Sequence, residues 1–320
     1  MIIIRLMGGL GNQLQQYALY QKFISLGKEV YLDTSWFDLS KQDSYSAPRK
    51  LELSLFDKAD FQKASSAQIA YLLGPDGITV SSIKDKVARI SGKVAQKIQL
   101  KPNYYFVESA QYHPEIFQME NAYLEGYWAA QKYYDDVMPI VREKLSFNQI
   151  NDENRIAAAQ IVQMACKPAH TCSVHVRRGD YLDPENAALF GGIATEDYYD
   201  SAFSLVRDNY PDTEFYIFSD DQEYVRGKYG ADEHCHFIDI NHGDNSRFDI
   251  YLMSQCNSHI CANSTFSFWG ARLDTKETTG NTSSLKIRPT IHKNSQTYNP
   301  EEMKNIWAGW ICIDPKGNVK

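Results

Sequence analysis

The chain has 320 residues, 43% of them apolar, and carries 33 basic against 40 acidic side chains. This length exceeds the size at which one hydrophobic core usually keeps growing, so we expect two domains. Because the formal net charge is −7, no nucleic acid partner is expected, and any anionic ligand must be held by a local arrangement of side chains.

Membrane insertion and disulfides are not expected. No stretch approaches the roughly 18 to 20 uninterrupted apolar residues that a membrane helix needs, and the apolar start at residues 1–5 is too short for a secretory signal. The six cysteines show no CxxC spacing, which fits reduced structural thiols. Cys235-His236 has no second pair at ligand spacing, so we expect no metal site. Without a membrane helix or a secretory signal, we expect a cytoplasmic protein.

The first half opens with an apolar run at residues 2–6 that stops at a glycine loop around Gly8, Gly9 and Gly11. Apolar residues then recur at helical spacing up to residue 26, and a second apolar run at 29–32 ends at Asp33. Strand, glycine turn, helix and strand in this order predict a βαβ unit and a parallel sheet. We expect only helices and loops over 58–100, a short strand at 123–128 and a helical segment ending near 146.

A polar stretch at 148–154 predicts the domain junction. We therefore expect domains at 1–150 and 151–300, and a C-terminal segment at 301–320 that packs back on the body. After a predicted helix at 156–164, four short apolar strands each end in polar residues; these strands lie at 173–176, 215–218, 236–238 and 258–262. Predicted helices at 198–210 and 248–255 lie between them. The carboxyl ends of parallel strands line one edge of a sheet, so these four tips should converge on one crevice.

The strand at 173–176 ends in Arg177, Arg178, Gly179 and Asp180. A guanidinium keeps its charge and presents a fork of donors that matches phosphate oxygens, so the pair suits a diphosphate. Neighbouring residues of a strand point to opposite sides, which favours one arginine that binds the ligand and one that braces the loop. The alternative is a structural ion pair with Asp180 or Asp183.

The other strand tips carry further polar groups. Asp220 and Asp221 suit hydrogen bonds to guanine or to a ribose diol, or else an N-cap of the next helix. The run Asn263-Ser264-Thr265-Phe266-Ser267 suits a phosphate cradle of hydroxyls and helix amides, or a helix cap.

The first glycine loop has two interpretations, a ligand site and a tight structural turn. Asn12 and Gln13 lie next to a helix N-terminus, where their amides would reach a phosphate or a sugar hydroxyl. Gly9, Gly11 and Asp33 also match part of a dinucleotide fingerprint. An NAD-dependent oxidoreductase is therefore a second hypothesis, and a sugar-nucleotide or glycan binding protein without turnover is a third.

Taken in order, these segments resemble the bacterial α-1,2-fucosyltransferases of glycosyltransferase family eleven. The resemblance rests on five segments, at residues 8–18, 123–128, 175–181, 218–221 and 263–271. The chain departs from the family pattern at Gln15, at Phe268 and over residues 286–295.

The resemblance implies an α/β fold of the GT-B type, with two Rossmann-like parallel-sheet domains facing a cleft and the GDP-fucose donor held mainly by the second domain. It implies a galactoside α-1,2-fucosyltransferase, which transfers L-fucose from GDP-β-L-fucose with inversion to the 2-hydroxyl of a terminal galactose, without metal or cofactor. The implied partners are GDP-fucose and a galactose-terminated oligosaccharide or surface glycan, with peripheral membrane contact where the glycan is lipid-linked.

The resemblance also implies residue roles. Arg178, with Arg177, would neutralise charge on the β-phosphate. Asp180 would be the general base for the acceptor proton or, alternatively, would orient Arg177; the reserve candidates for the base are Glu125, Asp183, Glu196 and Asp197. The expected donor-binding residues are Gly11, Asn12, Gln13, His175, Asp220, Asp221, Asn263, Ser264, Thr265 and Phe266.

Overall fold

The computed structural model describes residues 1–38, 49–74, 103–107, 111–147, 149–166, 169–274, 284–294, 299, 301, 303–304 and 309–320. The chain divides into two compact units, Met1–Ser146 and Phe147–Lys320, which are described separately. The segment 301–320 belongs to the second unit. Among the described residues, no helix has both the length and the apolar character needed to cross a bilayer.

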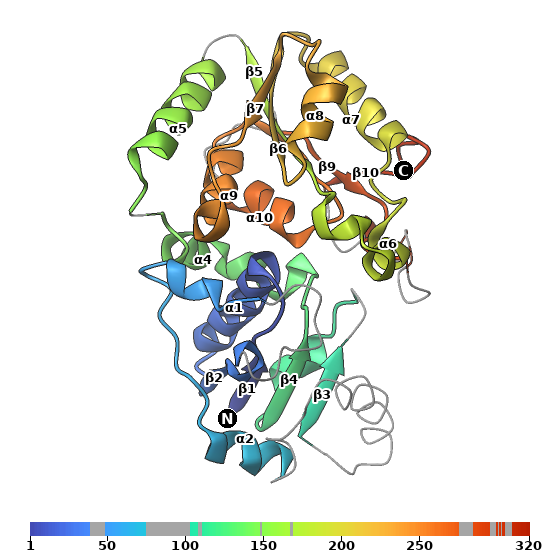
Figure 1. Ribbon diagram of the computed structural model, residues 1–320. Coiled ribbons are helices and arrows are strands. Elements are labelled where there is room, and N and C mark those ends of the chain that lie inside the picture. The colour runs from blue at the N-terminus through green and yellow to red at the C-terminus, as the bar shows by residue number, and fades with distance from the viewer. Residues whose placement is uncertain are drawn as a thin grey trace. The chain divides into compact units, whose positions relative to one another are not determined.

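The first unit contains a four-stranded parallel sheet (Figure 1). In spatial order its strands are β2 (Val30–Asp33), β1 (Ile2–Arg5), β4 (Ala122–Gly126) and β3 (Tyr104–Val107). The helices are α1 (Leu10–Ser25), α2 (Ser66–Leu73) and α4 (Met138–Lys144), with 3-10 turns at Ser35–Phe37, Glu52–Leu55, Pro114–Gln118, Gln131–Tyr133 and Asp135–Val137.

Local sequence explains the helix limits in this unit. The backbone of Gly9 is extended and caps α1, so the helix starts inside the glycine loop. Ser65 and Gln68 form a capping box at the start of α2, and Gly74, at φ 80°, ends it. On one face of the sheet, Ile3 packs with Tyr104 and Tyr123 against α2. The predicted βαβ unit and parallel sheet are confirmed; of the segment 58–100, residues 75–100 lie outside the described part.

The second unit contains a six-stranded sheet, also parallel throughout. In spatial order its strands are β10 (Ile311–Ile313), β9 (Lys286–Pro289), β8 (Ser258–Ile260), β5 (His170–Val176), β6 (Thr213–Ser219) and β7 (Cys235–Ile238). The helices are α5 (Asp152–Ala165), α6 (Pro184–Phe190), α7 (Glu196–Asn209), α8 (Gln222–Tyr229), α9 (Arg247–Ser254) and α10 (Thr265–Leu273), with 3-10 turns at Gly179–Leu182 and Gly243–Ser246.

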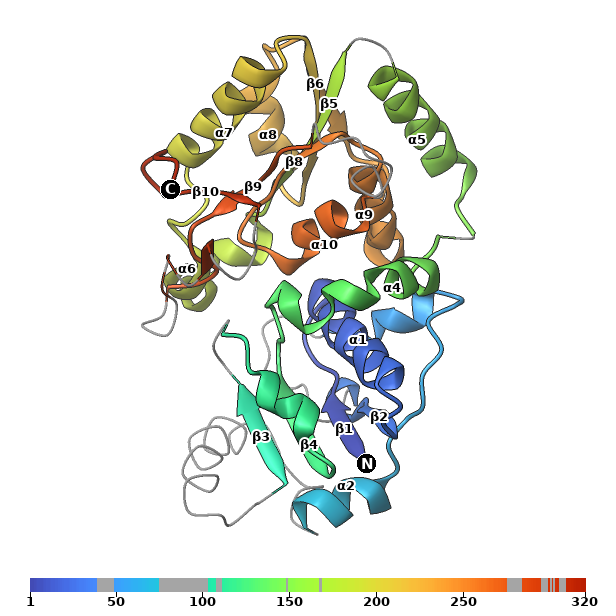
Figure 2. The same ribbon diagram turned by 180° about the vertical axis from the view of Figure 1, so that it is seen from behind.

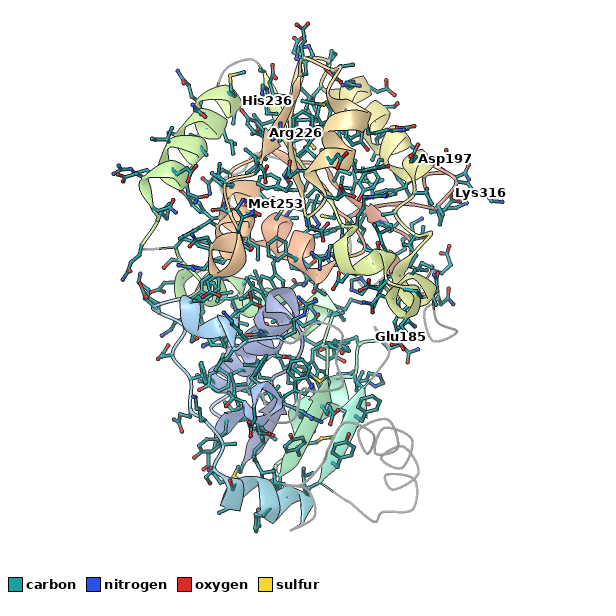
Figure 3. The ribbon with its side chains drawn as sticks, viewed as in Figure 1. Glu185, Asp197, Arg226, His236, Met253 and Lys316 are labelled. Atoms are coloured by element: carbon teal, nitrogen blue, oxygen red, sulfur yellow. The ribbon has the colours of Figure 1, made fainter. Side chains whose placement is uncertain are left out.

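Helices cover both faces of this sheet, as Figure 2 shows from behind. Val174 of β5 and Ile217 of β6 lie in one buried cluster with Val225 of α8 and residues of α7. Across the sheet, α9 and α10 pack closely because Gly270 leaves room for Met253, whose Cβ lies 2.8 Å from the position that a Cβ of Gly270 would take (Figure 3). The two parallel sheets confirm the predicted α/β class and its two Rossmann-like domains.

The four strands predicted to converge, β8, β5, β6 and β7, are neighbours in this sheet, so their carboxyl ends lie along one edge. The strands β9 and β10, and β3 of the first unit, were not predicted from the sequence. Arg288 of β9 is fully buried and donates to the backbone carbonyls of Pro289 and Met303, at 3.1 and 2.7 Å, so the C-terminal segment is tied to the sheet.

Candidate functional site

Arg177 lies between two carboxylates at the end of β5. Its Nη2 donates to Oδ1 of Asp180 and its Nη1 pairs with Oδ2 of Asp220, each over 2.6 Å. Burial opposes the positive charge, but Asp220 and Asp180 outweigh it and raise the pKa of Arg177. Both terminal nitrogens of this arginine are therefore already engaged, which is the arrangement of a brace.

Asp220 holds the backbone of the same loop. Its Oδ1 accepts the backbone N–H of Arg178 over 2.8 Å. Its Cγ lies 3.0 Å from the place where a Cβ of Gly179 would be, so the carboxylate reaches the loop only because Gly179 has no side chain. Asp220 thus fixes the turn that follows the strand.

Arg178 contacts the first residues at and after the N-cap of α8 and leaves its two terminal nitrogens without partners in the described part of the chain. Its Nε donates to Oδ2 of Asp221 over 2.9 Å, and its guanidinium lies 3.7 Å from the ring centroid of Tyr224. Among the residues described, neither Nη1 nor Nη2 of Arg178 has a hydrogen-bond partner, and the side chain is 32% exposed. These contacts make Arg177 a brace of the loop, whereas the binding role expected for the other arginine stays a prediction for Arg178.

Asp221 caps α8 through the backbone N–H of Tyr224, over 3.0 Å. This hydrogen bond, followed by the guanidinium of Arg178, lowers the pKa of Asp221. All four carboxylate oxygens of Asp220 and Asp221 already have a partner, so guanine binding would have to share an oxygen with the cap or the arginine.

His175 is buried beside Phe266, with ring centroids 5.5 Å apart. Burial, reinforced by the charge of Arg177, lowers the pKa of His175 to about 3, so the imidazole is neutral at working pH. Its Nδ1 is buried without a partner among the described residues. At neutral pH the ring therefore carries one N–H proton and no positive charge.

The tip of β8 is linked to the arginine loop. The side-chain amide of Asn263 donates to the backbone carbonyls of Phe190 and His292, at 3.1 and 3.2 Å, and the backbone carbonyl of Asn263 accepts the hydroxyl of Tyr181 over 3.1 Å. Ser264 is the N-cap of α10, makes no side-chain cap bond and is partly exposed. Asn263 is therefore a brace, whereas Ser264, Thr265 and the amides that follow stand at a helix N-terminus.

In the first unit, Gln13 is wholly buried and fully bonded. Its Oε1 accepts the backbone N–H groups of Glu52 and Leu53, and its Nε2 donates to the carbonyls of Gly8 and Lys50, all within 3.0 Å. Gly11 is also buried, in the first turn of α1, while Asn12 is partly exposed. The expectation that Gln13 donates to the nucleotide does not fit these contacts, because its amide has no donor left.

Asp33 is 3% exposed and is occupied as well. It accepts the hydroxyl of Tyr123 at 2.5 Å and the backbone N–H of Ser35 at 2.9 Å. A dinucleotide site needs this carboxylate free for a ribose diol. The geometry therefore gives no support to the NAD hypothesis.

The reserve carboxylates lie in different surroundings. Glu125 is bound by Arg5 and by the hydroxyl of Tyr104, both at 3.0 Å. Glu196 is tied to Lys228 and Tyr224, and Lys228 lowers its pKa most. Asp183 is exposed ahead of α6, and Asp197 is exposed on α7 near Lys316 (Figure 3). Within the described ranges, no three His, Cys, Asp or Glu side chains form a group suited to a metal ion.

Tyr224 and the bracing role of Tyr181 were not predicted from the sequence. Tyr181 stacks on Phe190, with centroids 4.8 Å apart, and lies under the guanidinium of Arg177. The available signal for Tyr224 was its spacing: a residue three positions after a capping Asp lies in the first helical turn, next to the strand tips.

Comparison with known proteins supplies the family. The model described as glycosyl transferase family 11 matches residues 66–314. The chain is 28% identical to the O-antigen biosynthesis glycosyltransferase WbnK of Escherichia coli, over 85% of this chain and 90% of that protein. It is 29% identical to an α-1,2-colitosyltransferase of Escherichia coli, over 85% of this chain and 87% of that protein.

Among solved structures, the fucosyltransferase NodZ from Bradyrhizobium matches with a TM-score of 0.46 at 12% identity, over 84% of this chain and 92% of that chain. Since the family model spans well over half of the chain, the protein belongs to glycosyltransferase family 11.

Proposed function

We propose that this glycosyltransferase transfers L-fucose from GDP-β-L-fucose, with inversion, to the 2-hydroxyl of a terminal galactose. The observation that supports this most is Arg178, a held guanidinium whose two terminal nitrogens have no partner among the described residues, at the ligand edge of a parallel sheet. The names of two relatives, an α-1,2-colitosyltransferase and an O-antigen glycosyltransferase, support a 1,2-linkage and a surface glycan as acceptor.

In the proposed reaction, the acceptor oxygen forms a bond to the anomeric carbon of fucose while the bond from that carbon to the β-phosphate oxygen breaks. The electron pair leaves with GDP, and Arg178 donates hydrogen bonds to the β-phosphate as negative charge grows there. Guanidinium forks neutralise a diphosphate without proton transfer, so this chemistry needs no metal or cofactor.

The other residues divide into two groups. Ser264, Thr265 and the first amides of α10 would complete the phosphate cradle, because a helix N-terminus favours an anion. Asp220 and Asp221 both stay proposed contacts for guanine, and either would share an oxygen with its present partner. Asn12, in the first unit, remains a proposed donor contact.

Asp180 is proposed as a positioning residue. Its Oδ1 accepts from Nη2 of Arg177 over 2.6 Å, so this carboxylate would orient the arginine that braces the loop. The acceptor proton would pass to solvent water late in the step, when the fucosyl centre already resembles an oxocarbenium ion.

The test is transfer of radiolabelled fucose from GDP-fucose to lactose by the full chain, with EDTA present, and NMR of the product to read its linkage and anomeric form. We expect an α-1,2 product from wild type and a loss of about 10² to 10³ in kcat for Arg178→Ala. The matched control is Arg226→Ala, which removes an exposed arginine of α8 whose guanidinium lies over the ring of Phe237 (Figure 3).

Several results would count against the proposal. Full activity of Arg178→Ala would exclude the role given to that residue, and GDP binding without turnover on any galactoside would favour a binding protein. Because one relative is named a colitosyltransferase, GDP-colitose is the second donor to assay, and its exclusive use would replace fucose in the proposal.

A further inference from the structure

The turn after β4 contains a strained residue. Trp128 has φ 52°, and no other residue besides glycine in the described ranges has a positive φ. A bulky side chain in the left-handed region costs energy, and such residues gather at functional sites. Trp128 is also 1% exposed, so its conformation is imposed from inside the unit.

Two buried glutamines of α1 hold this turn. The amide of Gln16 donates to the carbonyl of Gly126 over 3.0 Å, and that of Gln15 donates to the carbonyl of Tyr127 over 2.8 Å. Gln16 also accepts the backbone N–H of Met7, so the turn is tied to the glycine loop that follows β1. The carboxyl ends of β1 and β4 are neighbours, which places the turn at the ligand edge of the first sheet.

A second feature also lowers stability. The indole Nε1 of Trp128 is buried without a hydrogen-bond partner in the described part of the chain. Its ring packs edge-on against Tyr133, with centroids 5.5 Å apart, and its Cε2 lies 3.1 Å from the Cβ position of Gly126. A sequence that keeps a strained backbone and an unpaired buried donor in one turn keeps them for a reason other than stability.

What the turn presents is Tyr127. This residue is partly exposed, and its hydroxyl has no partner among the described residues, although its backbone carbonyl accepts a hydrogen bond from Gln15. A tyrosine offers an apolar ring face and a polar tip that both donates and accepts, which matches a pyranose with one C–H face and a rim of hydroxyls.

We propose that Tyr127, oriented by the left-handed Trp128, binds the acceptor sugar of this glycosyltransferase. The inference rests on the proposed function, and it adds the acceptor subsite that sequence analysis did not locate. The ligand class is a neutral pyranoside, because tyrosine offers a ring face for the C–H face of the sugar and a hydroxyl that donates to and accepts from its hydroxyls. Gln15 acts through the backbone of Tyr127 and is therefore a positioning residue.

The experiment measures kcat and KM for lactose and, separately, KM for GDP-fucose with the full chain. Tyr127→Ala should raise the lactose KM about tenfold or more, as loss of one hydrogen bond and a ring contact would. Tyr127→Phe should raise it less, and Gln15→Leu should raise it with little change in kcat. GDP affinity should stay as in wild type for all three variants.

The control is Tyr71→Ala, which removes a tyrosine of the same unit that is 70% exposed on α2. Unchanged lactose KM in Tyr127→Ala, with transfer intact, would overturn the inference and leave the proposed function standing. Equal losses of lactose and GDP-fucose binding would also overturn it, since they would indicate a structural role. Absence of GDP binding and transfer in wild type would instead refute the proposed function.

Discussion

The carboxylate of Asp220 fills the space that a side chain on Gly179 would need, with its Cγ 3.0 Å from the ideal Cβ position. From there it bonds Arg177 and the backbone N–H of Arg178 at the same time. Two segments 41 positions apart, the end of β5 and the end of β6, thus form one unit, since 220 − 179 = 41. The arginine pair depends on this contact for its position.

Gly179→Ala should therefore displace Asp220 and cut transfer about 10²-fold or more, because misplacing a phosphate-binding group by an ångström has effects of this size. The measurement is kcat/KM for GDP-fucose, with circular dichroism to verify folding. Gly227→Ala on α8 is the matched control: nothing lies within 4 Å of its Cβ position, so it should keep activity and gain up to about 1 kcal/mol of stability. Full activity of Gly179→Ala would contradict the bracing role of Asp220.

Arg177 and Asp180 should be energetically coupled, whereas Arg178 and Asp180 should not. A double-mutant cycle with Arg177→Ala and Asp180→Asn is expected to show an interaction energy of about 0.5 to 3 kcal/mol in transition-state binding, since the two side chains are in contact. The same cycle with Arg178→Ala should be additive within about 0.5 kcal/mol. If Asp180 were the general base, Asp180→Asn would instead remove the acidic limb of the pH–rate profile, where protonation of the base lowers the rate, whichever arginine was present.

Tyr224 is expected to hold Arg178 through its ring and not through its hydroxyl. Tyr224→Phe keeps the face on which the guanidinium lies and should retain near-normal donor affinity. Tyr224→Leu removes the cation–π contact and should weaken GDP binding by about 3- to 30-fold, corresponding to about 0.5 to 2 kcal/mol. Isothermal titration with GDP distinguishes the two, and equal losses in both variants would indicate that the bond to Glu196 is the relevant one.

Apolar runs were enough to predict most strands of both sheets, because buried parallel strands read as short continuous apolar segments. The strand β9 was not predicted because Lys286 and Arg288 interrupt its apolar pattern, although both side chains are buried in the fold. A buried charged residue in a strand can be recognised only from its partners in the folded chain, which for Arg288 are two backbone carbonyls that accept its hydrogen bonds.

The site was predicted at the level of residue types and much less at the level of roles. Because the carboxyl ends of parallel strands line one edge of a sheet, Arg177, Asp220 and Asn263 were predicted to lie at the same edge. It could not tell that Asp220 and Asn263 brace loops while Arg178 keeps free donors, since that depends on hydrogen bonds between residues far apart in sequence. The positive φ of Trp128 could not be predicted either, because no sequence pattern indicates a tryptophan in the left-handed backbone region.

Gln13→Leu should separate bracing from ligand binding in the glycine loop. The change leaves the buried N–H groups of Glu52 and Leu53 without an acceptor, so we expect a loss of about 2 to 4 kcal/mol in unfolding free energy. GDP affinity at a temperature where the variant is folded should equal that of wild type. A selective loss of GDP affinity with unchanged stability would restore Gln13 as a donor contact.

Two histidines at the start of β7, an edge strand of the second sheet, should make the free energy of unfolding depend on pH. His234 and His236 both bond Glu214, at 3.2 and 2.6 Å, and the bond to Glu214 raises the pKa of His234. A raised folded-state pKa means that the stabilisation is complete below about pH 6.5, the unfolded value, and is lost as pH rises through the folded value. Denaturant unfolding of wild type and His234→Gln should therefore differ most near about pH 5 to 6 and converge near about pH 8 to 9. Glu214→Gln should show the same pH dependence, and a His234→Gln deficit that grows with pH would contradict the assignment.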